Sequence, residues 1–156
     1  MKSGKTAKWI LLLCCLGAGS IWAETAEQLI AQGDRYWAEQ KTEMAEQQFK
    51  AAIEMAPESA LAHERLAAFY LAQNQNQQAI EEYKTAITLK PEDPSLFVAI
   101  CLAYLHEGAY SASQAMCNRA LELDPESENA RQLQQYIDVR IKAGNTRAPG
   151  NHPPVE

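Results

Sequence analysis

The chain has 156 residues, of which 47% are hydrophobic and 22% charged, and it carries a formal net charge of −6 at pH 7. This length and composition are typical of one globular unit rather than several domains. Binding to nucleic acid depends on cations that neutralise phosphates, so we expect this acidic chain to have no nucleic-acid partner.

The first residues differ in character from the rest of the chain. Three lysines among the first eight residues precede an apolar run at residues 9–16, and mostly small residues follow as far as Ala23. This order predicts a secretory signal peptide at residues 1–23, and so a periplasmic or secreted mature protein. The apolar stretch is shorter than the roughly 20 residues that a spanning helix needs, and an uncleaved membrane anchor is the alternative.

Three prolines recur at a fixed spacing of 34 residues, at Pro57, Pro91 and Pro125. A serine or aspartate stands two residues after each proline, where it can cap the helix that follows. Self-similarity at a fixed period of this length indicates stacked structural units.

Further columns of residues follow the same spacing. These columns are Tyr36, Tyr70 and Tyr104; Gly33, Ala67 and Cys101; Ala45, Ala79 and Ser113; Phe49, Tyr83 and Cys117; and Ala52, Ala86 and Ala120. Within each unit the apolar residues recur at helical spacing in two stretches, so each unit is predicted to be a helical hairpin. The small columns would let the paired helices approach closely. We expect Thr42, Asn76 and Ser111 to cap the second helices.

This pattern closely resembles the tetratricopeptide repeat, with units at residues 26–59, 60–93 and 94–127. The resemblance implies an all-α solenoid of three antiparallel helical hairpins.

A C-terminal capping helix is predicted at residues 128–143, because the apolar face of the third hairpin would otherwise stay open. The predicted repeat domain therefore covers residues 24–143. Residues 144–156 contain three prolines and no apolar periodicity, and we predict that they form a disordered tail.

The resemblance also implies that the first helix of each unit lines a concave surface that binds a partner. The predicted groove residues are Ile30, Asp34 and Trp37; Leu61, Glu64, Ala68 and Leu71; Val98, Leu102, Leu105 and His106; and, in the capping helix, Tyr136 and Val139. This mostly apolar set suits an amphipathic helix or an extended peptide with apolar anchors. Relatives that grip a C-terminal carboxylate have Lys and Asn where Ile30 and Asp34 stand, so that clamp is not expected. Covering of the groove by the chain itself or by a second copy is the alternative.

Cys101 and Cys117 are predicted to face each other across the third hairpin. Paired helix axes 8–10 Å apart bring Cα atoms within or near the span that a disulfide closes. Export to an oxidising compartment would favour the bond, and two buried thiols in contact are the alternative.

The histidines and cysteines show no pair at metal-ligand spacing, and no catalytic constellation is apparent. We therefore expect no metal, no cofactor, no small-molecule substrate and no enzymatic activity. The predicted function is that of a protein-interaction scaffold or assembly factor of the bacterial envelope. Its partner would be a secretion, pilus or envelope-assembly component, by analogy at the level of the fold. The alternative is a self-associating structural protein, such as a homodimer, without a separate client.

Overall fold

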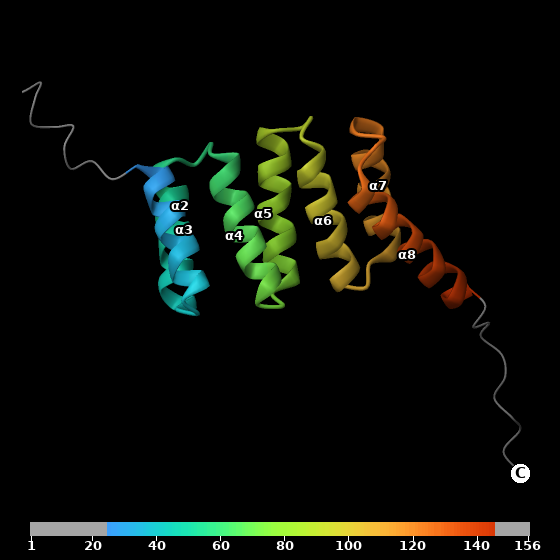
Figure 1. Cartoon of the computed structure of the whole chain (residues 1–156), viewed down its shortest axis with the longest axis horizontal. Coiled ribbons are helices and arrows are strands. Elements are labelled where there is room, and N and C mark those ends of the chain that lie inside the picture. Colours follow the sequence, from blue (N-terminus) through green and yellow to red (C-terminus); the bar gives the residue numbers. More distant parts are fainter. Residues whose placement is uncertain (1–24, 146–156) are drawn as a thin grey trace, which may run out of the picture.

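In the computed structural model, the described residues are 25–145, and they form seven helices and no strand. The helices are α2 (Ala26–Ala38), α3 (Thr42–Met55), α4 (Ala60–Ala72), α5 (Asn76–Leu89), α6 (Pro94–His106), α7 (Tyr110–Leu123) and α8 (Glu128–Asn145). They follow one another in chain order along the long axis of the molecule, with α2 overlapping α3 in this view and α8 inclined to its neighbours (Figure 1). This arrangement confirms the predicted all-α solenoid.

The helices pack most closely in consecutive pairs. Helix α2 packs on α3, α4 on α5, and α6 on α7, while α8 packs on α7 and also touches α6. Helix α8 continues through residues 144 and 145, which the sequence pattern assigns to the tail. The predicted signal peptide and the rest of the predicted tail lie outside the described residues. Within residues 25–145, no helix is both long and apolar enough to cross a membrane.

Side chains cap the first helix of each pair. The hydroxyl of Thr25 accepts from the backbone N–H of Gln28, whose side chain in turn accepts from the N–H of Thr25. Ser59 accepts from the N–H of Ala62, as its place after the proline predicts. Asp93 accepts from the N–H of Ser95 at 3.0 Å, and Pro94 begins the helix with its φ already suited to it.

The turn inside each pair does not use the predicted caps. Thr42 and Asn76 are the first helical residues, Ser111 lies within α7, and the true N-cap residues Lys41, Gln75 and Ala109 make no side-chain cap bond. The preceding helix instead ends in a left-handed residue, at Gln40, Asn74 and Gly108. The N–H of the following residue donates to the carbonyl of the tyrosine that recurs every 34 residues, as the N–H of Lys41 does to Tyr36 at 2.8 Å. This hydrogen-bond pattern is a Schellman motif, which satisfies the helix end without a side chain.

Small buried residues lie where the paired helices meet. Ala45, Ala67 and Ala79 have no exposed surface, and Gly33 is buried against the ring of Phe49. Aromatic rings fill the space beside this contact, because Phe49 packs against Trp37 and Phe69 with ring centroids 6.4 and 5.9 Å apart. The first two pairs therefore share one continuous core.

The contact at Gly33 predicts that an added methyl group destabilises the fold. A Cβ at this position would lie 2.6 Å from Cε1 of Phe49. We expect Gly33→Ala to lower the free energy of unfolding by about 1–3 kcal/mol, despite the better helix propensity of alanine. Arg35→Ala, at an exposed position of the same helix, should change it by less than about 0.5 kcal/mol. Urea unfolding followed by circular dichroism measures both, and equal stability of the two variants would refute the close contact.

The left-handed turn predicts the opposite outcome at Gln40, which has a φ of 60°. Glycine adopts this conformation without the steric cost that a Cβ brings. We expect Gln40→Gly to raise the free energy of unfolding by about 0.5–1 kcal/mol, and Gln47→Gly, at an exposed position inside α3, to lower it by about 1 kcal/mol. A loss of stability in both variants would contradict this account of the turn.

Candidate functional site

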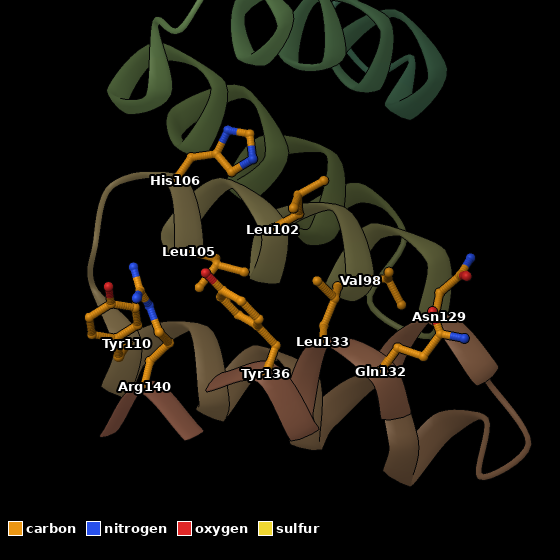
Figure 2. Close-up of a pocket in the computed structure, with 10 residues that line it drawn as sticks. All are labelled: Val98, Leu102, Leu105, His106, Tyr110, Asn129, Gln132, Leu133, Tyr136 and Arg140. Carbon is orange, nitrogen blue, oxygen red and sulfur yellow. The ribbon is translucent and has the colours of Figure 1, made fainter. Parts of the chain in front are cut away.

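A groove with a volume of about 650 Å³ lies between α6 and α8, and we call it the α6–α8 groove (Figure 2). Its lining residues come from α6, the start of α7 and α8: Val98, Leu102, Leu105, His106, Tyr110, Asn129, Gln132, Leu133, Tyr136 and Arg140. Apart from the adjacent pairs Leu105–His106 and Gln132–Leu133, the lining residues of α6 and α8 are spaced three or four residues apart, so each helix presents one face to the groove.

Helix α8 has this position because of its contacts with α7. The amide of Gln114 donates to Asp138 at 2.7 Å, and the amide of Gln134 donates to Asn118. Ile137 is fully buried against the two cysteines of the third pair. Helix α8 also touches α6, and the groove lies between these two helices.

The groove is apolar in the middle and polar at its two ends. Leu102, Val98 and Leu133 lie between the amides of Asn129 and Gln132 at one end and a cation at the other (Figure 2). That cation is Arg140, and its guanidinium lies 5.5 Å from the ring centroid of Tyr136 and 6.0 Å from that of Tyr110. Such a site can hold apolar side chains and can orient them by hydrogen bonds at the ends.

The structure brings together five of the residues that the sequence predicts for a groove: Val98, Leu102, Leu105, His106 and Tyr136. Two lining residues with apolar surface were missed. Tyr110 begins α7, outside the first-helix positions that the resemblance implies, and Leu133 lies one residue beyond Gln132 on α8. Helical spacing from Asn129 to Leu133 was the available signal for the second.

The predicted residues of α2 do not reach this groove. Ile30 is only 5% exposed and belongs to the core, so its assignment to an open surface is wrong. Trp37 packs edge-on against Phe69, with ring centroids 5.8 Å apart, and is half-buried. Asp34 lies 3.9 Å from Arg65 of α4 as an ion pair. Trp37 and Asp34 are thus engaged in contacts with α4, although both remain partly exposed.

The predicted residues of α4 and the last one of α8 also lie outside the groove. Leu61 is 39% exposed, whereas Glu64, Ala68 and Leu71 are half-buried. Glu64 lies near Tyr83 of α5. Burial, with a smaller contribution from the Glu64 carboxylate, raises the pKa of Tyr83 to about 12, so this tyrosine stays neutral at ordinary pH. Val139 is 64% exposed and does not line the groove.

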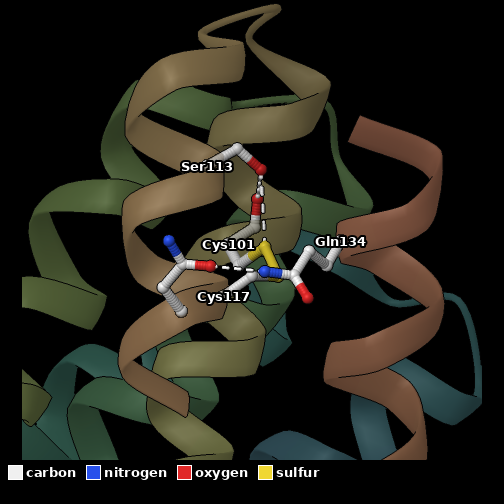
Figure 3. The surroundings of a disulfide bond; sticks show 5 residues. Cys101, Ser113, Cys117 and Gln134 are labelled. Carbon is white, nitrogen blue, oxygen red and sulfur yellow. Dashed lines mark hydrogen bonds between the residues drawn. A yellow bond between two sulfur atoms is a disulfide. The ribbon is translucent and has the colours of Figure 1, made fainter. Parts of the chain in front are cut away.

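Cys101 of α6 and Cys117 of α7 face each other (Figure 3). Their sulfur atoms are 2.07 Å apart, at bonding distance, and their Cα atoms are 5.5 Å apart. Ser113 lies beside them, where its hydroxyl donates to the Cys101 carbonyl at 2.7 Å. Leu105, Tyr110 and Leu133 pack against this cluster and also line the groove, so the cysteine pair supports the groove from behind.

The buried histidine has a structural role. Nδ1 of His63 lies 2.7 Å from a carboxylate oxygen of Glu82, and Nε2 lies 3.0 Å from the carbonyl oxygen of Pro57. Both ring nitrogens are therefore used to join α4 to α5 and to the turn before α4. Residues 25–145 contain no group of three or more His, Cys, Asp or Glu side chains placed to hold a metal ion.

The fold matches solved structures over most of its length. The Sgt2 TPR domain from Aspergillus fumigatus superposes with a TM-score of 0.73, at 19% identity over 84% of this chain and 88% of that one. The first TPR of Spaghetti (RPAP3), bound to the HSP90 peptide SRMEEVD, gives 0.72 at 17% identity, over 76% of this chain and 94% of that one. The TPR2B domain of yeast Sti1, in a complex with pHsp70, gives 0.68 at 21% identity, over 74% and 97%. At these identities the likeness concerns the fold.

The amino-acid sequence was also compared with curated proteins and with models of protein families. None of the curated proteins compared with the chain matches it. Two family models, each described as a tetratricopeptide repeat, match residues 30–94 and residues 71–137. Together the two matches run without a gap over more than half of the chain, and the chain belongs to the tetratricopeptide-repeat family.

Proposed function

We propose that this protein is a non-catalytic scaffold or assembly factor that holds a segment of a partner protein in the α6–α8 groove. The observation that carries the proposal is the groove itself, which has an apolar centre and polar groups at both ends. Domains of this family typically mediate protein–protein interaction. The neighbours solved with peptides of Hsp90 and Hsp70 support a peptide segment as the class of ligand.

The place of action that we propose is the bacterial envelope. This part of the proposal rests on residues 1–23, whose lysines and apolar run are typical of a signal peptide. The cysteine pair at bonding distance is compatible with an oxidising compartment. A component of a secretion, pilus or other envelope assembly is the proposed partner, and the N-terminal residue of the mature protein would test the export step.

Self-association is a second candidate, because two large apolar side chains of α8 are exposed. Tyr136 is 50% and Val139 is 64% exposed, and they lie three residues apart on one face of the helix. If a homodimer forms through this face, sedimentation analysis should give a mass that rises with concentration in the native protein but not in Val139→Glu. A mass that stays monomeric at all concentrations would exclude this candidate.

If the partner binds in the α6–α8 groove, a charged residue in place of Leu102 should abolish binding, whereas the same change at Leu61 should not. Leu102 lines the groove, whereas Leu61 is exposed on α4 outside it. We expect Leu102→Glu to lose the proteins that the native chain captures from an envelope extract, because a carboxylate in the apolar centre would be poorly solvated. Leu61→Glu, the matched control, should keep them.

Circular dichroism must first show that both leucine variants are folded. If Leu102→Glu captures the same partners, or if Leu61→Glu loses them, the binding surface lies outside the α6–α8 groove.

We also propose that Cys101 and Cys117 are oxidised in the protein. Thiol labelling of the unfolded, unreduced protein should then leave both unlabelled, and reductant should lower the free energy of unfolding by about 2–4 kcal/mol through loss of the closed loop. The double variant Cys101→Ala, Cys117→Ala is the control, because reductant should leave its stability unchanged. Labelling of both cysteines without reductant would establish the buried thiol pair instead.

A further inference from the structure

We propose that the Arg140 end of the α6–α8 groove is a binding site for a side-chain carboxylate. The partner segment is then an internal stretch of a protein chain that carries Asp or Glu beside apolar residues. This inference rests on the proposed function and names the chemistry that the groove selects.

Arg140 is exposed, lies against two aromatic rings and forms no ion pair with a carboxylate of residues 25–145. Among residues 25–145, Arg65, Arg119 and Arg131 each lie within 4 Å of a carboxylate, at 3.9, 2.9 and 3.3 Å, whereas Arg35 of α2 and Arg140 have no such ion pair. The Arg140 guanidinium instead lies near the rings of Tyr110 and Tyr136. An arginine positioned against aromatic rings keeps its N–H groups for an anion, and its planar fork matches a carboxylate.

The charge of the groove is opposite to the charge of the chain. The protein has 20 acidic and 14 basic residues, yet none of the ten residues that line the groove is acidic. A carboxylate that enters at Arg140 therefore meets a cation and no lining anion. Complementary charge of this kind selects partners and suppresses wrong ones, even where it adds little to the total affinity.

The groove is open at both ends, which favours an internal side chain over a chain terminus. Beyond Arg140 and Tyr110, a second hollow continues over residues 108–112 and Ile141. At the other end, Val98, Leu102 and Asn129 also line a hollow that continues to Pro94 and Asp124. A bound segment can therefore run past Arg140. Asp124 is the one acidic residue in that opposite hollow, so an acidic residue of the partner is favoured at the Arg140 end.

The test uses random peptides displayed between two flexible linkers, so that no peptide has a free terminus. The purified protein should enrich peptides that combine apolar residues with Asp or Glu. Enriched sequences are then made as synthetic peptides with acetylated and amidated ends, and their affinities are measured by fluorescence anisotropy. Replacing the acidic residue by its amide should weaken binding about tenfold, the effect expected for one hydrogen-bonded charge pair.

Charge reversal at Arg140 supplies the second arm of the test. Arg140→Glu should weaken the binding of the acidic peptides by at least about tenfold. In a fresh selection, this variant should enrich peptides with Lys or Arg. Arg140→Gln should lose the acidic preference without gaining a basic one. Lys142→Glu is the matched control, because Lys142 is an exposed cation on the same helix that does not line the groove. It should leave both selections unchanged.

The outcomes separate this inference from the proposed function. If peptides bind and are lost with Leu102→Glu or Leu102→Ala, but show no acidic preference or keep it in Arg140→Glu, the carboxylate site is rejected and the groove remains. Binding that requires a free C-terminal carboxylate also rejects the internal side chain. Failure to enrich any peptide, or binding that survives both Leu102 variants, rejects the groove and the carboxylate site together.

Discussion

The close approach of two helices within each pair is the constraint on which the rest of the structure depends. At this contact the side chains are reduced to a hydrogen or a methyl group, as at Gly33, Ala45, Ala67 and Ala79, and all of them are buried. Because the paired helices cannot approach in this way with larger residues, the small columns fix how each pair packs. Aromatic residues beside the contact then pack one pair on the next, and the 34-residue spacing produces a row of helices.

The third pair departs from this scheme, and the groove is found beside it. Where the first two pairs have the aromatic residues Phe49 and Tyr83, the third has Cys117, which is much smaller. Ile137 of α8 is buried against this cysteine, and the last helix packs on α7 and also touches α6. In the first two pairs, the ring of Trp37 of α2 packs against that of Phe69 of α4. The α6–α8 groove lies at the α8 end of the described row of helices.

The sequence alone predicts the helices well and the groove only in part. Residues that recur every 34 positions occupy equivalent places in successive helix pairs. The capping residues Ser59 and Asp93 could therefore be assigned from the sequence. The turn at Gln40 could not, because a left-handed backbone at a glutamine has no strong sequence signal. Whether Ile30 is exposed depends on its neighbours in space, and its place in the repeat does not report them.

Helix α8 is the last described element of the row, and it lines the α6–α8 groove together with α6. In a stack of helices each element is stabilised mainly by its neighbours, and α8 has neighbours on one side only. A segment bound in the groove would contact α6 and α8 together and so add to the contacts between these two helices. Binding of this kind stabilises the folded state by mass action. Leu105 and Leu133 line the groove and also pack against the buried cysteine pair, so a bound segment would contact the side chains that cover this pair.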